Sequence, residues 1–384
     1  MSQLQPEGTI TPYQGYALLV TTVIGVEVVV FPRFLSREAG PDGIWIMLIS
    51  GLITTFLVYL MTRLCQQFPQ QSITQFVPRI LGSKHSPRLG RLLSAPLMLL
   101  LLISWLGIVA MITRSFGEVM VSAVLVETPI EFIMGTLCAI GAIVTSNRPE
   151  ILARYAEFLL PFLYPPILLI LFAVIQEGDW LNLLPLFQVN WHQVFKGLLH
   201  SLATFGGIKV ILIFMAFYQQ PQRAMHSHIS AMVIIMIGYL GTFLSALSIF
   251  GKDEIVHLLW PTLEVVKQIR IPGGILERVE SAVLVVWMVA VFTSITAMLG
   301  ASVQLIISAF RLKEHYRKWI ALGGAAIVYF VGILPTTVNQ LLQWSYRFGL
   351  LDVGIALALP LLLFGVLKIR GGKGAIEQDE QPPV

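Results

Sequence analysis

Long apolar stretches separated by short polar connections run through the whole chain. A helix needs about 20 mostly apolar residues to cross the hydrocarbon core of a membrane. Ten stretches meet or approach this length: residues 12–31, 43–65, 92–120, 129–145, 151–175, 197–217, 229–250, 281–310, 319–334 and 350–369. The sequence lacks the alternating segments of about ten residues that mark a membrane β-barrel. The pattern therefore predicts an all-α membrane protein with about ten transmembrane helices.

Composition supports an integral membrane protein. Of 384 residues, 56% are hydrophobic and 12% are charged, whereas soluble domains carry about 25% charged residues. The mean hydropathy is +0.80. We attribute the net charge of +4 to basic connections that meet anionic lipid headgroups, and we expect no nucleic-acid partner. Cys65 and Cys138 have neither a disulfide framework nor metal-ligand spacing, so no metal site is expected.

The distribution of basic residues predicts an orientation. Lys and Arg are enriched after the second and eighth stretches and again after the tenth. Cytoplasmic connections carry an excess of these residues, so both termini are expected to be cytoplasmic. The opposite face also has basic residues, and the bias is not overwhelming. Residues 370–384 are poor in large apolar side chains and are predicted to form a disordered cytoplasmic tail.

Two stretches contain glycines beside a charged residue. The first reads "VIGVEVV" over residues 23–29, and the sixth reads "ATFGGIKVI" over residues 203–211. Each glycine costs a helix interior about 1 kcal/mol relative to alanine. Transporters built from inverted repeats interrupt corresponding helices around a site at the bilayer midplane. We therefore predict one transmembrane domain over residues 1–384, with a 5+5 inverted repeat (11–176 and 195–369) and helices 1 and 6 broken.

The two breaks are the candidate ligand site, because interrupted helices leave backbone N–H and C=O groups for a polar ligand. Glu27 and Lys209 each follow the glycines of a break. Charges inside a membrane usually face a cavity or a counter-charge, so this pair is expected to form an ion pair or to contact the ammonium and carboxylate of a zwitterion. Snorkelling to the interface or a purely structural pair is the alternative. The candidate ligand-binding residues are Thr21, Thr22, Gly25, Glu27, Ala203, Gly206, Gly207 and Lys209.

Other polar positions have simpler interpretations. Arg114 and Glu118 are four residues apart on one predicted helix face and suit an anchor near the outer boundary. Asp352, near the start of the tenth stretch, is interpreted as an interface or cap residue. Residues 254–269 are too short and too interrupted to span, and are expected to form an outer lid that Pro261 divides into two pieces.

Three stretches carry a family resemblance: "VIGVEVVVFPRFLSREAGPDGIWI" (23–46), "TRSFGEV" (113–119) and "LLWPTLEVVKQIRIPGGILERVESAVLVVWMVAVFTS" (258–294). They resemble the spore germination permease family, the GerAB-like B subunits of germinant receptors, within the amino acid/polyamine/organocation superfamily. The resemblance implies a LeuT-like fold in the inner membrane of a bacterial spore. It also implies an A-type membrane subunit and a C-type lipoprotein as partners, and a small nutrient, often an amino acid, as the ligand.

The resemblance also bears on individual residues. Sodium-coupled members of this fold hold a cation with hydroxyls placed like those of Thr293 and Ser294, although such hydroxyls more often bond to a neighbouring backbone. The position of Glu27 is usually small in the family, and that of Lys209 often carries an acid. This chain therefore departs from the family at two positions, with charges of opposite sign. Such a pair suggests that the charges were exchanged between the two segments, so the ligand of other family members is not assigned to this chain.

Three functions are compatible with this pattern. The first is a germinant-sensing subunit that binds a nutrient between helices 1 and 6. The second is a proton-coupled amino acid permease in which Glu27 or another buried charge titrates, and the third is a conduit for water or ions. Because phosphate-binding loops, dinucleotide fingerprints, nucleophile elbows and HExxH motifs do not occur, we expect neither an enzyme nor a cofactor.

Overall fold

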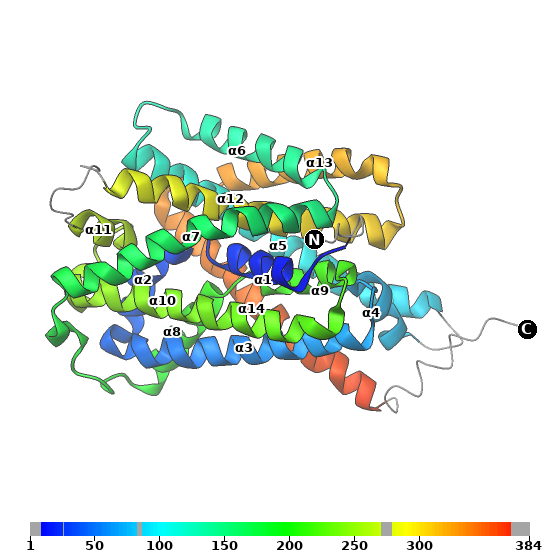
Figure 1. Cartoon of the computed structure of the whole chain (residues 1–384), viewed down its shortest axis with the longest axis horizontal. Coiled ribbons are helices and arrows are strands. Elements are labelled where there is room, and N and C mark those ends of the chain that lie inside the picture. Colours follow the sequence, from blue (N-terminus) through cyan, green and yellow to red (C-terminus); the bar gives the residue numbers. More distant parts are fainter. Residues whose placement is uncertain (1–8, 26, 83–86, 270–278, 370–384) are drawn as a thin grey trace, which may run out of the picture.

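The computed structural model describes residues 9–25, 27–82, 87–269 and 279–369. Within these ranges the chain is helical, and the single β-bridge joins Ile10 to Tyr218. The predicted tail, 370–384, lies outside the described residues. Figure 1 shows long helices side by side along one axis, with α11 at one end of the molecule and α4 at the other.

The elements of the first half are α1 (Pro12–Val23), α2 (Glu27–Ala39), η1 (Gly40–Asp42), α3 (Gly43–Gln67), α4 (Ile73–Leu81), α5 (Pro87–Ala123), α6 (Ile130–Thr145) and α7 (Pro149–Glu177). Those of the second half are η2 (Trp180–Leu183), α8 (Trp191–Thr204), η3 (Ile208–Val210), α9 (Ile211–Phe214), η4 (Met215–Phe217), η5 (Pro221–Arg223), α10 (Ala224–Ile255), α11 (Pro261–Gln268), α12 (Val279–Phe310), η6 (Glu314–Tyr316), α13 (Arg317–Ile333) and α14 (Val338–Ile369).

Every predicted stretch is largely helical, which confirms the all-α membrane class. By length and apolarity, six helical segments of the described chain can cross a membrane, or up to seven if a bent pair of helices is one span. The helices α6 and α13 are shorter, with 16 and 17 residues. The total of ten spans and the division at residues 11–176 and 195–369 therefore remain predictions.

One boundary differs from the prediction in a way that matters for the site. The helix α14 begins at Val338, whereas the apolar stretch begins at residue 350. The side-chain oxygen of Thr337 accepts a hydrogen bond from the backbone N–H of Gln340 at 3.2 Å, as a helix N-cap does. Polar side chains continue through the first turns of α14, so its apolar content does not mark where it begins.

The chain is interrupted at both places where glycines stand beside a charge. The helix α1 ends at Val23 and α2 begins at Glu27. A Cβ at Gly25, inside this break, would collide with the side-chain oxygen of Ser294. The second break follows Thr204, and the segments on its two sides, 191–204 and 208–217, are bent by 46°. Gly207 has a φ of +95° there, in the left-handed region that favours glycine.

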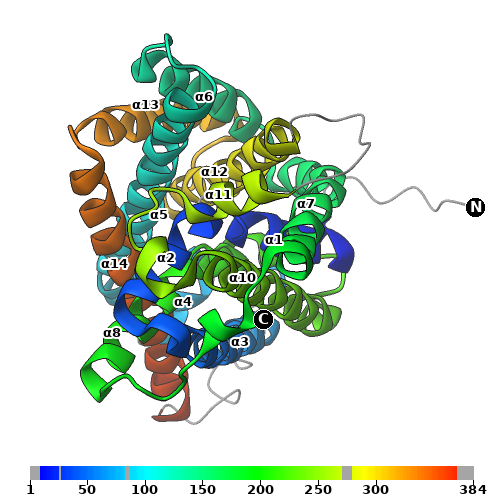
Figure 2. The same cartoon turned by 90° about the vertical axis from the view of Figure 1, so that its left-hand side faces the viewer.

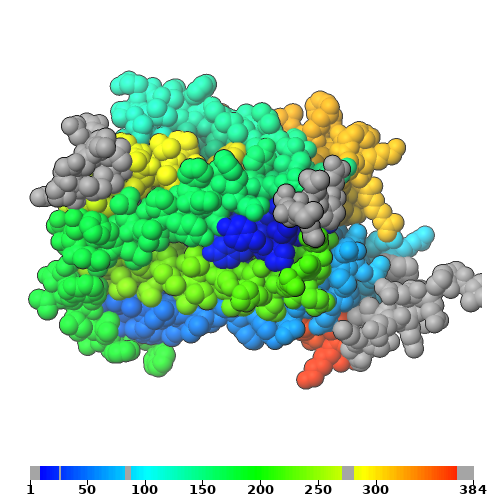
Figure 3. All heavy atoms as spheres, viewed as in Figure 1, coloured from blue at the N-terminus to red at the C-terminus, as the bar shows by residue number. Residues whose placement is uncertain are grey.

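The first helix is enclosed by longer ones. It packs against α7, α10 and α12, and Figure 2 shows it among these helices when the molecule is seen end-on. In Figure 3 its dark-blue surface is a narrow strip between α7 and α10. The helix α8, in turn, packs against α2, α3 and α14. This arrangement places both breaks inside the bundle.

Candidate functional site

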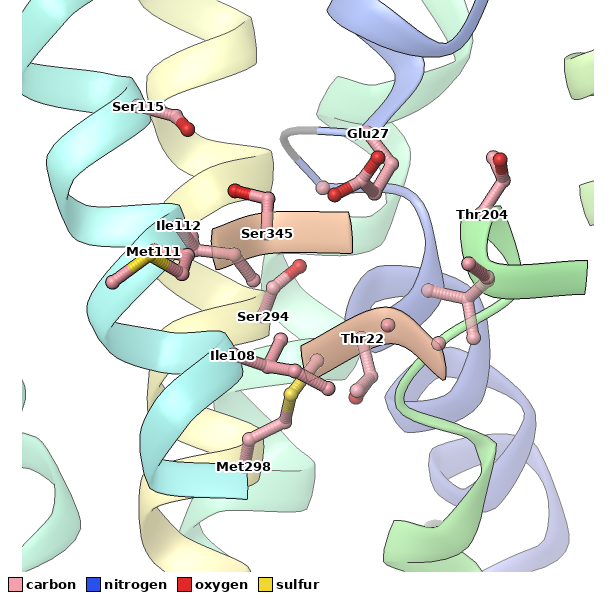
Figure 4. A pocket seen from close by; sticks show the side chains of 15 residues that line it. Thr22, Glu27, Ile108, Met111, Ile112, Ser115, Thr204, Ser294, Met298 and Ser345 are labelled. Atoms are coloured by element: carbon pink, nitrogen blue, oxygen red, sulfur yellow. The ribbon is translucent and has the colours of Figure 1, made fainter. Parts of the chain in front are cut away.

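A pocket of about 40 Å³ lies between the two breaks. This volume is the space open to the centre of a water-sized sphere, and a single water needs about 10–15 Å³ of it. This conformation therefore has room for about three waters. The residues that line it come from five segments of the chain (Figure 4). They contribute Thr22, Val23, Gly25 and Glu27 from the first break, Ala203, Thr204 and Gly206 from the second, Ile108, Met111, Ile112 and Ser115 from α5, Ser294 and Met298 from α12, and Ser345 and Gly349 from α14.

The structure brings five of the eight predicted ligand-binding residues to this pocket. They are Thr22, Gly25, Glu27, Ala203 and Gly206. Thr21, Gly207 and Lys209 are not among its lining residues. The hydroxyl of Thr21 instead donates to the carbonyl oxygen of Leu18 within α1 at 3.3 Å.

Lys209 has a different partner from the one predicted. Its side chain is 0% exposed, and its ammonium forms an ion pair with the Asp352 carboxylate of α14. The same ammonium donates to the backbone oxygen of Asp352 at 3.2 Å, and Ser104 of α5 donates to Oδ1 of this carboxylate at 2.7 Å. The predicted ion pair between Glu27 and Lys209 is therefore wrong. The lysine side chain is directed toward α14 and away from the first break.

The interpretation of Asp352 as an interface or cap residue is also wrong. It lies 14 residues after the first residue of α14, about 21 Å along the helix axis at about 1.5 Å per residue. It is 2% exposed. The sequence did contain a usable signal, because Asp352 is the one acid of the tenth apolar stretch and Lys209 is the one lysine or arginine of the sixth. Lone intramembrane charges of opposite sign are candidates for pairing.

Glu27 is the one charged side chain among the described residues that line the pocket. It is partly buried, and within the described chain its carboxylate takes part in neither an ion pair nor a hydrogen bond. It occupies the first position of α2, where a negative charge interacts favourably with the helix dipole. Figure 4 shows it across the pocket from Ser345 and Ser115.

The two hydroxyls of the proposed cation site join α12 to α1. Thr293 and Ser294 each lie 3.1 Å from the carbonyl oxygen of Thr21, to which either can donate. Each can donate instead to the carbonyl oxygen of Ala290, at 2.8 Å and 3.1 Å respectively. This is the backbone bonding that hydroxyls in membrane helices commonly make. A cation at these oxygens remains a prediction.

Residues outside the pocket stabilise its surroundings. Arg114 and Glu118 of α5 form the expected pair, at 2.8 Å. The segment 254–269 is interrupted as predicted: α10 ends at Ile255, and Pro261 begins α11, where a proline at the first helical position loses no intrahelical hydrogen bond. The hydroxyl of Thr262 donates to the carbonyl oxygen of Val28 at 2.6 Å, so α11 is attached to the residue that follows Glu27.

Histidine does not form a metal site in the described chain. His228 is fully buried, and its two ring nitrogens lie 2.8 Å from the hydroxyl of Thr62 and 2.9 Å from that of Tyr218. Among the described residues there is no group of three or more His, Cys, Asp or Glu side chains arranged to hold a metal ion.

Comparison with known proteins gives relatives of one kind. The family described as "Spore germination protein" matches residues 9–341. The chain is 25% identical to spore germination protein GerLB of Bacillus cereus, over 94% of this chain and 95% of that protein. It is 26% identical to spore germination protein A2 of Bacillus subtilis, over 96% and 98% of the two chains.

A solved structure shares the fold. The crystal structure of MhsT in complex with L-phenylalanine superposes with a TM-score of 0.63, covering 93% of this chain and 89% of that chain at 13% identity. This likeness supports the LeuT-like fold class. The family match covers most of the chain, and the structural match agrees with it in architecture. The chain therefore belongs to the spore germination protein family.

Proposed function

We propose that the chain is the nutrient-sensing B subunit of a spore germinant receptor, and that its ligand is an amino acid or a closely related amino compound. The ligand binds between the two breaks, with its ammonium group on Glu27. One observation carries this proposal: a pocket between the breaks of a spore germination family member is lined by a carboxylate that has no partner within the described chain. An intramembrane carboxylate that lines a cavity is a ligand-site candidate by default.

Binding is expected to change the packing of the bundle. The pocket is small and its walls come from five helical segments, so a ligand larger than a few waters has to separate them. A ligand shifts such an equilibrium only by its difference in affinity for the two states. The receptor's A-type membrane subunit and C-type lipoprotein would detect the shifted state. We place the complex in the spore inner membrane, with both termini of this chain cytoplasmic.

Germination of spores tests this function. Spores that carry the native subunit, lack it, or carry Glu27→Gln are exposed to a panel of amino acids while the loss of optical density is followed. We expect deletion to abolish the response to at least one nutrient, and Glu27→Gln to weaken that response while the protein level is unchanged. Deletion spores that respond normally to every nutrient would exclude the sensor.

The unpaired carboxylate also favours a second function, that of a proton-coupled amino acid permease. A carboxylate that lines a pocket and lacks a counter-charge can exchange a proton during transport. Proteoliposomes that contain this chain alone, with an imposed pH gradient, test this function. Uptake of labelled amino acid that depends on the gradient and on Glu27 supports the permease, and binding without uptake supports the sensor.

A further inference from the structure

We propose that the pocket prefers ligands with an ammonium group and a net positive charge over zwitterions of the same skeleton. Amines and amino-acid amides belong to the preferred class. This inference rests on the proposed function, because it requires that the ligand occupy the pocket between the breaks. It follows from the charge and the hydrogen-bonding capacity of the residues that line this pocket.

The charge of the lining is negative. Glu27 is the one charged residue among the described lining residues, and the counter-charge predicted from the sequence, Lys209, is neutralised by Asp352. A monocationic ligand would neutralise the carboxylate. A zwitterion would add a second carboxylate to a site that already contains an unpaired one. Because unpaired charge is costly inside a membrane, the pocket discriminates against the zwitterion.

Two glycine N–H groups of the pocket lining are already used. The N–H of Gly25 donates to the carbonyl oxygen of Val23 at 2.9 Å, and the N–H of Gly206 donates to that of Ala203 at 3.0 Å. The positive end of the α2 dipole would attract a ligand carboxylate. However, Glu27 occupies the first position of this helix and places its own negative charge there. The N–H groups of Gly25 and Gly206, the two glycines that line the pocket at the breaks, are therefore not free for a ligand carboxylate.

Most hydroxyl protons of the lining are also used. Thr22 donates to the carbonyl oxygen of Leu18 at 2.5 Å, and Thr204 donates to that of His200 at 3.1 Å. Ser294 donates to a backbone carbonyl oxygen at 3.1 Å. A hydroxyl has a single proton but can still accept hydrogen bonds. These three groups therefore present acceptors to the pocket, which suits an ammonium group and not a carboxylate.

Two hydroxyls keep their protons available. Ser115 and Ser345 line the pocket and form no hydrogen bond within the described chain. Figure 4 shows Ser115 on the side of the pocket away from Glu27, with Ser345 between them in this view. A carboxylate has about four lone-pair sites to satisfy, so the two serine hydroxyls are too few donors for it. The same two donors are enough for a carboxamide oxygen or a hydroxyl. The geometry thus favours a ligand with an ammonium group at one end and at most a neutral polar group at the other.

Matched ligands isolate the effect of the carboxylate. L-Valine, L-valinamide and isobutylamine share a side chain and an amino group, but only valine is a zwitterion. Binding to the full chain in lipid nanodiscs is measured by calorimetry at about pH 6.5, below the usual α-amino pKa of about 7.7–8.0. The alanine and phenylalanine pairs of acid and amide extend the test to smaller and larger side chains.

We expect the amide to bind at least about tenfold more tightly than the acid in a pair that fits, because the carboxylate of the acid lacks donors in the pocket and an unsatisfied charged group costs more than a neutral one. Glu27→Gln should remove this preference. Glu254→Gln, at an exposed position near the end of α10, is the matched control and should retain it. Acids that bind as tightly as their amides, with no effect of Glu27→Gln, overturn the charge preference and leave the nutrient site intact. If no member of the panel binds, the proposed function is itself contradicted.

Discussion

The ion pair between Lys209 and Asp352 gives the sharpest prediction about stability. The two side chains are 0% and 2% exposed, so neither charge can be solvated if its partner is removed. Breaking a buried pair on one side costs about 3–5 kcal/mol, whereas replacing both partners by apolar residues is often neutral or stabilising. Lys209→Met and Asp352→Leu should each destabilise the protein by about this amount, and the double variant should recover much of the loss.

The hydroxyl of Ser104 provides a smaller effect at the same carboxylate, against which the two charge substitutions can be compared. It contributes one hydrogen bond to the same carboxylate, worth about 1.5–3 kcal/mol because the acceptor is charged. Ser104→Ala should therefore cost less than either charge substitution. Unfolding is followed in nanodiscs by tryptophan fluorescence under denaturant. A double variant whose loss equals the sum of the two single losses would refute the coupling, as would single variants with native stability.

Further predictions concern the backbone and the ends of helices. Gly207→Ala should destabilise the protein by about 1–2 kcal/mol, because φ is +95° there. Gly323→Ala in α13, where an added Cβ would meet open space, should instead stabilise the protein by up to about 1 kcal/mol. Thermal unfolding of the two variants distinguishes these effects. Thr337→Ala should remove about 1 kcal/mol by uncapping α14, and unchanged stability would exclude the cap. Hydrogen bonding from Arg317 lowers the pKa of Glu314 in the folded protein. The ionised Glu314 side chain therefore stabilises the fold above its unfolded pKa of about 4.3, and this stability is lost as the pH falls through the folded pKa. Glu314→Gln should reduce the difference in melting temperature between neutral and acidic pH.

The sequence predicted the helices well because the membrane imposes a simple rule. A helix that crosses lipid has to satisfy its backbone internally and present apolar side chains, and both requirements are visible in composition. The breaks were predictable for a related reason. Gly25 and Gly207 stand where the chain cannot carry a Cβ without a collision or strain, and glycine is a recognisable residue.

The side-chain partners were harder to predict because they depend on where long helices begin and which face turns inward. The pairing of Lys209 was missed because the polar first turns of α14 hid its beginning at Val338 and placed Asp352 near an interface. The contribution of Ser345 to the pocket was missed for the same reason, and that of Ile108 was missed for the second. A uniformly apolar helix gives no periodic signal for its inner face, so tertiary packing decides which residues line the site.

The hydrogen bond between Thr262 and Val28 links the interior of the bundle to its surface. Val28 is the residue next to Glu27, and the short helix that holds Thr262 also carries the Lys267 and Glu264 side chains, which are 51% and 33% exposed. A movement of Glu27 toward a bound cation would pull on this bond and displace the short helix. Occupancy of a hidden cavity would then become a change of shape at an exposed helix.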